Sequence, residues 1–232
     1  MKRLHVVLLA AAGCLWLPGS AAAQLGPSLF SKPNIADIFK PVVGSGAAYE
    51  QHSTDEKRPA SQMEMTIVGK ELTANGEAYW MEIGHVGKEG AGMMYSKVLV
   101  TKDFQFTKII FQQPGQPAME MPFDGQTGRS HMKEEMAKWH QVGSETITVP
   151  AGTFSCMHWK NEDGTDEVWT SDKVTPMAMV KQVGKNRSMV LTKIITGATD
   201  HITGPVTKFD PKALQQQMLQ QKQQQKQQQK QQ

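Results

Sequence analysis

The fold is decided by the stretch Glu145–Lys181, ETITVPAGTFSCMHWKNEDGTDEVWTSDKVTPMAMVK. It contains two turn signals, Pro150-Ala151-Gly152 and Asp163-Gly164. Proline presets the backbone for a turn, and glycine adopts the positive φ that many tight turns require. Short runs rich in β-branched and aromatic residues flank both signals, as in consecutive antiparallel strands. The stretch therefore predicts three strands joined by tight turns.

The same pattern continues toward the N-terminus. Met63, Met65 and Ile67 alternate with polar residues, which predicts a strand with one apolar face. Asn75-Gly76 favours a two-residue hairpin turn, because both central residues of that turn have positive φ. About ten segments are predicted to be short strands. They are Thr66–Thr73, Glu77–Val86, Met93–Thr101, Phe104–Gln112, Ala118–Pro122, Glu145–Val149, Thr153–Lys160, Asp166–Ser171, Ala178–Val183 and Ser188–Ile195.

These segments predict a mainly β fold, a curved antiparallel sheet or half-barrel with one or two short helices. The helical candidates are Asn34–Phe39 and Gly125–His140. In the second, Met132, Met136 and Trp139 recur at helical spacing. Because most connections are short, we expect strands that follow one another in the chain to pair in a single meander.

The N-terminus has the features of an export signal. Lys2 and Arg3 precede the apolar run Val6–Leu17, and Ala21-Ala22-Ala23 fits a cleavage site. The run is too short to span a bilayer, which takes about 20 helical residues. We therefore expect a periplasmic or secreted protein whose mature chain begins at Gln24.

A second interpretation of the signal involves Cys14. The segment Ala11-Ala12-Gly13-Cys14 resembles a lipoprotein box, in which Cys14 would be lipidated and become the first residue. However, Ala11 stands where leucine is usual, and a better cleavage site follows. Simple secretion is therefore favoured over a lipoprotein anchored at Cys14.

The chain divides into four segments along its length. These are a signal peptide (1–23), an N-terminal leader (24–46), an antiparallel β domain (47–204) and a Gln/Lys-rich low-complexity tail (205–232). The tail has almost no apolar residues to pack, which predicts a disordered or fraying segment. The alternative is a weak peripheral contact with anionic lipid or peptidoglycan.

Charge and cysteine content exclude some classes of protein. Loss of Lys2 and Arg3 with the signal lowers the formal net charge from +3 to +1, which gives no electrostatic argument for binding nucleic acid. Cys156 is then the one remaining cysteine, so no intramolecular disulfide is expected and the fold depends on its hydrophobic core. The oligomeric state stays open.

No pattern in the chain indicates an enzyme. Gly152–Cys156 lacks the spacing of a nucleophile elbow. Cys156 and His158 supply two ligands where a structural zinc site needs four. His131 and Glu135 lack the second histidine of a zincin motif. We therefore expect no catalytic residues, no metal ligands and no cofactor.

Methionine is unusually frequent, with 15 residues. Three Met-x-Met pairs occur: Met63/Met65, Met119/Met121 and Met177/Met179. Thioethers select Cu(I), so the pairs suggest a copper hypothesis for an exported protein. Flexible methionine also suits a core, or a cavity that accepts varied apolar ligands. Because no cluster of histidine and methionine is visible in the sequence, the core or cavity interpretation is favoured.

The predicted function is binding of an apolar ligand, such as an acyl chain, a lipid or a lipidated partner, on the concave face of the sheet. The alternatives are a structural or interaction protein of the cell envelope and a Cu(I)-handling protein. The candidate ligand-binding residues are methionine and aromatic side chains expected to line that face. They are Met63, Met65, Tyr79, Met81, Tyr95, Phe111, Met119 and Met121.

Three segments carry a resemblance to a known group of proteins: Val149–Cys156 (VPAGTFSC), Glu167–Ser171 (EVWTS) and Pro176–Lys181 (PMAMVK). They resemble uncharacterised bacterial periplasmic domains with a V-P-A-G-T-F-x-C turn before a W-x-S strand. Those domains are distantly similar to the LolA/LolB lipoprotein carriers, and the resemblance spans Ala47–Ala198 as a pattern. It implies a half-barrel that binds lipid. The chain departs from the carriers because it lacks their long N-terminal amphipathic helix, which places a lid over the ligand in doubt.

Overall fold

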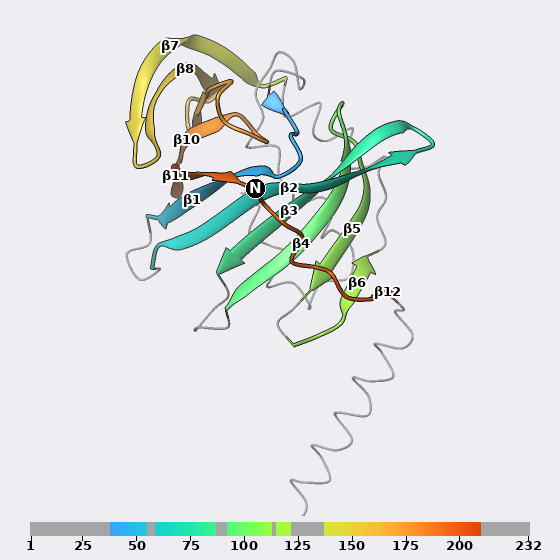
Figure 1. Cartoon of the computed structure of the whole chain (residues 1–232). Helices are drawn as coiled ribbons and strands as arrows, with labels where there is room; N and C mark the ends of the chain where they lie inside the picture. The colour runs from blue at the N-terminus through green and yellow to red at the C-terminus, as the bar shows by residue number, and fades with distance from the viewer. Residues whose placement is uncertain (1–37, 55–58, 87–91, 113–114, 122–136, 210–232) are drawn as a thin grey trace, which may run out of the picture.

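In the part of the chain that the structure describes, twelve strands form one open, curved sheet (Figure 1). The computed structural model describes residues 38–54, 59–86, 92–112, 115–121 and 137–209. Within these ranges the chain is almost entirely strand and turn, with helical geometry at Ile38 alone. The prediction of a mainly β fold built on a curved sheet is therefore confirmed.

The strands of the first half of the chain are β1 (Ser45–Ser53), β2 (Ser61–Thr73), β3 (Gly76–Val86), β4 (Met93–Thr101), β5 (Phe106–Gln112) and β6 (Ala118–Met121). Those of the second half are β7 (Trp139–Val149), β8 (Gly152–Asn161), β9 (Glu167–Thr170), β10 (Met179–Gly184), β11 (Arg187–Thr196) and β12 (Val206–Lys208). Most agree with the predicted segments. β2 contains the predicted alternation of Met63, Met65 and Ile67, and β7 begins several residues earlier than predicted. β1 had no predicted bounds within the domain expected from Ala47, and β12 was not predicted.

The strand order is β12-β6-β5-β4-β3-β2-β1-β11-β10-β9-β8-β7. Each half of the chain forms a meander, and the two meanders join where β1 pairs with β11, with Ser45 opposite Thr196 and Ser53 opposite Arg187. Hence β6 and β7, which are consecutive in the chain, lie toward opposite ends of the sheet. The expectation of a single meander is wrong, because β1 pairs with a strand from the far end of the domain.

The predicted turns lie where their residues favour them. Gly76 has a φ of 97° in the β2–β3 hairpin, and Gly152 has a φ of 134° directly after the Pro150-Ala151 turn between β7 and β8. The Ala151 N–H also donates to the Leu191 carbonyl at 3.4 Å. The tip of the β7–β8 hairpin therefore bends back onto β11, and this end of the sheet is rolled (Figure 1).

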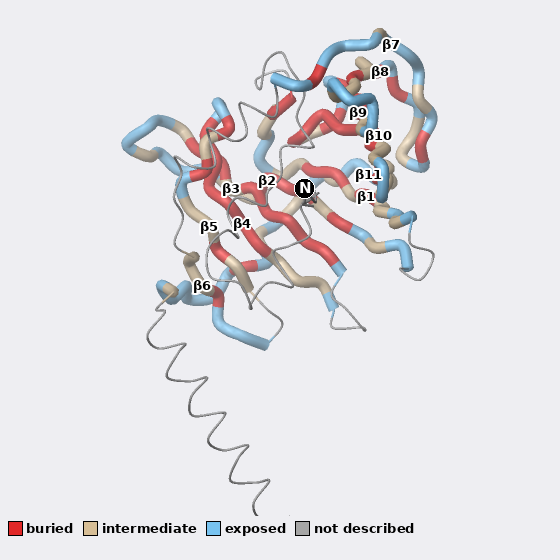
Figure 2. The backbone as a smooth tube through the Cα atoms, turned by 180° about the vertical axis from the view of Figure 1, so that it is seen from behind, coloured by how far each residue is buried: buried red, intermediate tan, exposed pale blue. Residues whose placement is uncertain are grey.

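The main hydrophobic core covers one face of the sheet, called here the core face. Strand register places Tyr49, Met63 and Ile83 on this face together with their buried neighbours. The core-face residues Ala47, Tyr49, Met63, Met65, Ile67, Met81, Val98 and Val100 are each at most 3% exposed. Figure 2 shows this buried band running through β2, β3 and β4.

The segment between β9 and β10 closes part of the core face. Met177 and Val174 are buried there, and the Tyr49 hydroxyl donates to the Met179 carbonyl at 3.1 Å. Burial raises the pKa of Tyr49, so this phenol stays protonated and keeps its bond. The Lys40 N–H donates to the Pro176 carbonyl at 2.8 Å, which ties the beginning of the described chain to the same segment.

The helix predicted over Gly125–His140 is wrong at its C-terminal end. Trp139 and His140 begin β7, where Trp139 is 5% exposed and pairs with Asn161. Trp139 is apolar because it is buried as the first residue of a strand, and its spacing from Met132 and Met136 therefore does not indicate a helix there. Residues 122–136 lie outside the described part of the chain. Of the other candidate, Asn34–Phe39, the described residues are Ile38 and Phe39, both of which are buried.

The sheet continues beyond the domain end predicted at residue 204. β12 pairs in parallel with β6, with Val206 opposite Ala118, and the Phe209 N–H donates to the Glu120 carbonyl at 2.9 Å. The signal, Cys14, most of the leader and residues 210–232 lie outside the described residues. In the part of the chain that the structure describes, no helix is long and apolar enough to cross a membrane.

Candidate functional site

Seven of the eight predicted ligand-binding residues share the core face. In the register of the sheet, Met65 lies opposite Ile83, and Phe111 lies opposite Met119. β4 connects these pairs, since Val98 faces Met81 on one side and Ile109 on the other. The seven are Met63, Met65, Tyr79, Met81, Phe111, Met119 and Met121.

These seven residues divide into two groups by exposure. Met63, Met65, Tyr79 and Met81 are at most 6% exposed and belong to the closed core. Phe111, Met119 and Met121 are half-buried, as is Ile109 beside them. We call Ile109, Phe111, Met119 and Met121 the open row. It continues the core face onto β5 and β6, where apolar side chains reach the surface.

Tyr95 lies on the opposite face, here called the outer face. It pairs with Gly84, and a Cβ added to Gly84 would lie 2.9 Å from Tyr95 Cε1. The absence of that Cβ gives the phenol ring room, and the ring stacks on His201 with centroids 4.2 Å apart. The sequence did not reveal this, because Met93-Met94-Tyr95 and Val98-Leu99-Val100 are apolar at successive positions and the segment has no clear alternation.

A short segment, residues 197–205 and here called the strap, crosses the outer face from β11 to β12. Glu82 is buried beneath it, with Oε1 2.6 Å from His201 Nδ1 and Oε2 accepting the His201 N–H at 3.0 Å. Lys97 pairs with Asp200 and donates to the Ile202 carbonyl at 3.0 Å. Burial raises the pKa of Glu82, and the contacts from His201 act in the opposite direction. The side chains of Glu82 and Lys97 therefore hold the strap against the sheet through hydrogen bonds and ion pairs.

A second polar cluster lies on β7, β8 and β9. His158 is held between two carboxylates, with Nδ1 3.0 Å from Glu145 and Nε2 2.7 Å from Glu167. Trp169 stacks on the imidazole with centroids 4.4 Å apart and donates its Nε1–H to Glu145 at 2.6 Å. Both imidazole nitrogens therefore lie within hydrogen-bond distance of a carboxylate.

Cys156 is 2% exposed in the same region. Burial, with a further contribution from Glu145, raises the pKa of its thiol to about 11. A thiol must ionise to act as a nucleophile or a zinc ligand. Among the described residues, no group of three or more His, Cys, Asp or Glu side chains is arranged to hold a metal ion.

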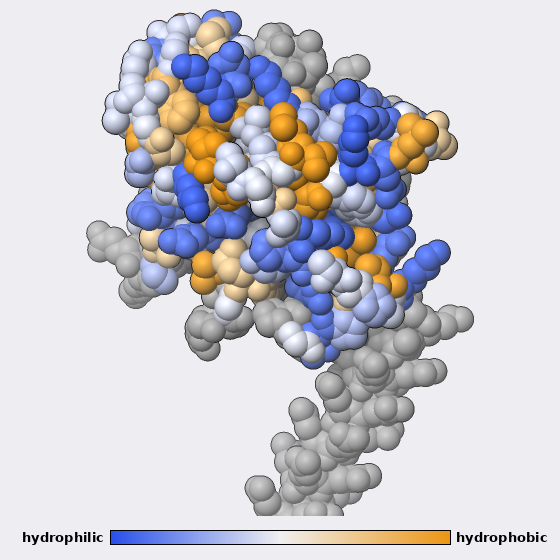
Figure 3. Space-filling model, in the orientation of Figure 1, coloured by the Kyte–Doolittle hydropathy of each residue, from blue (hydrophilic) through white to orange (hydrophobic). Residues whose placement is uncertain are grey.

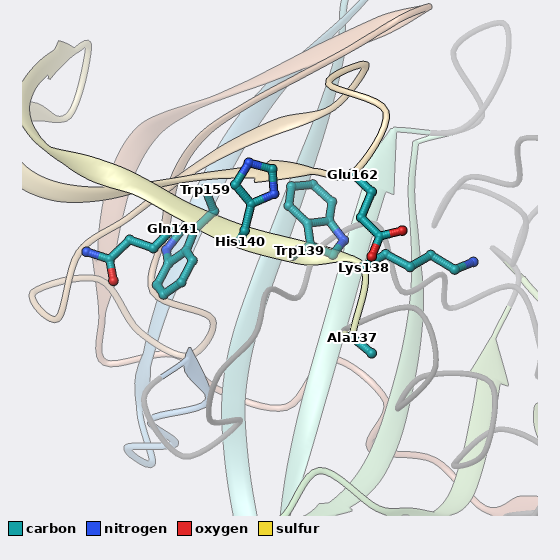
Figure 4. Close-up of a pocket in the computed structure, with 7 residues that line it drawn as sticks. All are labelled: Ala137, Lys138, Trp139, His140, Gln141, Trp159 and Glu162. Carbon is teal, nitrogen blue, oxygen red and sulfur yellow. The ribbon is translucent and has the colours of Figure 1, made fainter.

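A hollow of about 500 Å³ opens beside the start of β7 (Figure 4). The indoles of Trp139 and Trp159 come from the neighbouring strands β7 and β8, and Lys138 points away from them (Figure 4). Its lining is Ala137, Lys138, Trp139, His140, Gln141, Trp159 and Glu162. None of these was a predicted site residue. Lys138, His140 and Glu162 are the ionisable side chains of its lining.

Apolar surface is also exposed in separate patches. Figure 3 shows them divided by charged and polar surface, including one at the tip of the β2–β3 hairpin. Leu72 is 86% exposed near that tip. Single exposed apolar residues are common on protein surfaces, so Leu72 does not by itself define a site.

The sheet also brings together a histidine and methionines that are far apart in the sequence. His85 on β3 lies opposite Met63 on β2 and opposite Met94 on β4. The copper interpretation was set aside because no such cluster was visible in the sequence. The register of the sheet brings this cluster together. A search of the sequence for ligand spacing misses it, because the residues come from three strands.

Comparison with known protein families finds no match, and no curated protein matches the chain. Two solved structures are similar to this chain. Each match covers 68% of this chain and 98% of the solved chain. One is a candidate lipoprotein from Parabacteroides distasonis, with a TM-score of 0.35 and 13% sequence identity. The other is a candidate exported protein with a YmcC-like fold from Bacteroides fragilis, with a TM-score of 0.35 and 12% identity. A likeness at this level assigns no family, ligand or location to the present chain.

Proposed function

We propose that the protein is an exported binding protein that takes up an apolar ligand, such as an acyl chain or a lipidated partner, along the open row. The observation that carries the proposal is the continuity of the core face. Val98 is 2% exposed, its neighbour Ile109 is half-buried, and Met121 beyond Ile109 is half-buried as well. Along this row, apolar side chains thus run from a closed core onto an accessible surface.

The energetics of such a surface suit a long aliphatic chain. Burying one methylene group stabilises a complex by about 0.8 kcal/mol. About ten methylenes against the open row would then supply roughly 8 kcal/mol, which corresponds to a micromolar dissociation constant before the costs of association. Methionine suits this role because its unbranched side chain adapts to ligands of different shape. The resemblance to lipid-binding half-barrels agrees with the same ligand class.

Export is supported by the N-terminal signal sequence, and a binding role is favoured over catalysis by the state of the polar groups. The Cys156 thiol is protonated, while both nitrogens of His158 and both oxygens of Glu82 have partners. The partners of these groups lie within the protein, which supports a binding role. The alternative is a structural or interaction protein of the cell envelope, which the buried group Met63, Met65, Tyr79 and Met81 favours.

The test is a fluorescence titration with N-phenyl-1-naphthylamine, followed by displacement with palmitate and with phospholipid. We expect saturable binding that the double substitution Met119→Lys and Met121→Lys weakens at least tenfold, about the effect of 1.4 kcal/mol. Val142→Lys is the control, because Val142 is 50% exposed on β7 and lies outside the open row. Substituting Met63 or Met65 would be uninformative, because each is 1% exposed and lysine there would disrupt the core.

Two outcomes would count against ligand binding. One is the absence of saturable probe binding by the unmodified protein. The other is an equal loss of affinity in Val142→Lys and in the double variant. Either result would leave the structural envelope protein as the better assignment.

A further inference from the structure

The rim of the core face carries a cluster of soft ligands. β1 and β3 end along one edge of the sheet where β2 and β4 begin, at the lower left of Figure 1. Met63, His85 and Met94 lie near these strand ends and share the core face. Gln51 and Met189 are at the same rim, paired with each other across β1 and β11.

Register sets the spacing of the three central residues. His85 lies directly opposite Met63 on one side and directly opposite Met94 on the other. Residues opposite one another on one face of an antiparallel pair have Cβ atoms about 4.5–5.5 Å apart. The imidazole is therefore flanked by a thioether side chain on each neighbouring strand.

The side-chain amide of Gln51 contacts the sulfur atoms of two methionines at this rim. Gln51 Nε2 lies 3.5 Å from Met63 Sδ and 3.3 Å from Met189 Sδ. Thioether sulfur is a weak hydrogen-bond acceptor. These contacts therefore add little stability, but they show that two sulfur atoms converge on one polar group.

The histidine has an unused nitrogen. His85 is 5% exposed, and its Nε2 is buried without a hydrogen-bond partner among the described residues. A buried polar atom left unsatisfied costs about 1–3 kcal/mol, so a ligand bound to this nitrogen would relieve that cost. A neutral imidazole is the form that binds metal ions.

We propose that Met63, His85 and Met94 bind one Cu(I) ion, with Met189 adjoining the site. The ligand set selects the ion by its chemistry. Two thioethers and one neutral imidazole are soft ligands that suit Cu(I). Structural Zn²⁺ needs four ligands rich in thiolate and imidazole, and Mg²⁺ and Ca²⁺ need oxygen.

The cluster combines buried and partly accessible side chains. Met63 and His85 are buried, whereas Met94 and Gln51 are half-buried at the ends of their strands. The ion would reach Met94 first and then meet the two buried ligands. The site is separate from the open row and does not depend on the proposed ligand binding.

The test is an anaerobic Cu(I) titration of the full chain against a chromophoric Cu(I) chelator, with Cys14→Ser and Cys156→Ala to remove both thiols. We expect one Cu(I) per chain. His85→Gln and Met63→Leu should each weaken binding at least tenfold, because even outer-shell changes at metal sites cost about 10–100-fold. Met81→Leu is the matched control: it is 3% exposed on the same face, opposite Ile67 and Val98, and should leave the affinity unchanged.

X-ray absorption of the Cu(I)-loaded protein provides a readout that does not depend on substitution. Sulfur and imidazole nitrogen should both appear in the first shell of the metal. The proposal is overturned if no stoichiometric Cu(I) binds, if the first shell lacks nitrogen, or if Met81→Leu weakens binding as much as Met63→Leu does. If Met63→Leu fails to fold, His85→Gln and the absorption spectrum decide the matter. Tighter binding of Zn²⁺ than of Cu(I) would also contradict it.

Discussion

At the scale of single residues, burial sets the chemistry of the one cysteine that the sheet contains. The pKa of Cys156 is raised from its ordinary value of 9.0 to about 11. At pH 8 only about one thiol in a thousand is then ionised. We expect iodoacetamide to label Cys156 at least tenfold more slowly in the native protein than in urea, measured by mass spectrometry of the peptide that contains it. Equal rates in the two states would show that the thiol is exposed.

The same thiol predicts a pH dependence of stability. Its folded pKa lies above its unfolded pKa, so between pH 9 and about pH 11 the native state holds the proton more tightly than the unfolded state does. The contribution of Cys156 is therefore fully present below pH 9 and is lost as the pH rises through 11. Urea unfolding of Cys156→Ala should show a smaller decline in stability over this window than the unmodified protein does.

Individual residues also show where sequence reasoning stops. The pair Met63 and Met65 was predictable as one buried face, because the strand alternates cleanly. The face of Tyr95 was not predictable, since Met93 and Met94 directly before it are both apolar and Gly84 on the next strand makes room for its ring. The position of His85 beside Met63 depends on the register of β2 with β3, which the Asn75-Gly76 turn constrains but a search for motifs does not examine.

At the scale of elements, the close approach of β1 to β2 depends on one glycine. A Cβ on Gly46 would lie 2.5 Å from the Met65 carbonyl oxygen and 2.9 Å from Thr66 Cα, both backbone atoms. Backbone cannot move aside as a flexible side chain can, so Gly46→Ala should destabilise the protein by about 2 kcal/mol. Urea unfolding at equilibrium measures this.

Gly143 in β7 is the matched control for Gly46. A Cβ there would meet no atom within 4 Å, and Gly143 does not have a positive φ. We therefore expect Gly143→Ala to change the unfolding free energy by no more than about 0.5 kcal/mol. A similar loss in both variants would mean that the effect is general to strand glycines and does not arise from the β1–β2 contact.

Two truncations of the chain are expected to lower the thermal midpoint by very different amounts, because one keeps the strap and β12 and the other removes them. Ending the chain after Phe209 keeps every described contact of β12 and should lower the thermal midpoint by less than about 2 °C. Ending it after Gly197 removes Asp200 and His201, which leaves Lys97 and Glu82 without their partners. The truncation also removes the buried Ile202 and the pairing of β12 with β6, and the combined loss of at least about 3 kcal/mol should lower the midpoint by at least about 6 °C.

Differential scanning calorimetry of the two truncated chains makes this comparison. A large drop after truncation at Phe209 would show that the Gln/Lys-rich segment docks on the domain. Such docking is not expected, because Leu214, Met218 and Leu219 are nearly the only apolar residues of that segment. An unchanged midpoint after truncation at Gly197 would mean that the strap contributes nothing to stability.

The strands themselves were largely predictable, because each carries its own alternation and turn residues. β12 was not, because its three residues are exposed and are ordered by their pairing with β6. The early start of β7 was missed for a related reason, since Met132, Met136 and Trp139 share a helical spacing that Trp139 contradicts once it packs in the core.

At the scale of the whole molecule, we expect export with cleavage of the signal. Intact-mass analysis of protein from a cell that exports it should give a chain beginning at or near Gln24, and fractionation should place it outside the cytoplasm. A chain beginning at a diacylated Cys14 would instead identify a membrane-anchored lipoprotein. Replacing Lys2 and Arg3 by glutamate should impair export, because the signal requires a positive start.

The curved sheet was predictable as a class from the number of strands and the shortness of their connections. Its order was not, because no local signal states that β1 pairs with β11. That pairing is decided by long-range fit, such as Tyr49 opposite Leu191 on the core face, and long-range fit is absent from any single segment of the sequence.

The β1–β11 seam also determines when this protein can finish folding. The first meander, β1 to β6, leaves one edge of β1 without hydrogen-bond partners until β11 is available, and β11 lies near the end of the domain. Pairings between distant parts of a chain form slowly, and an open strand edge invites aggregation in the meantime. In a chain that leaves the ribosome or translocon N-terminus first, β1 therefore stays unprotected until nearly the whole domain has emerged. A holding chaperone would be most valuable in that interval, when β1 is already exposed and β11 has not yet emerged.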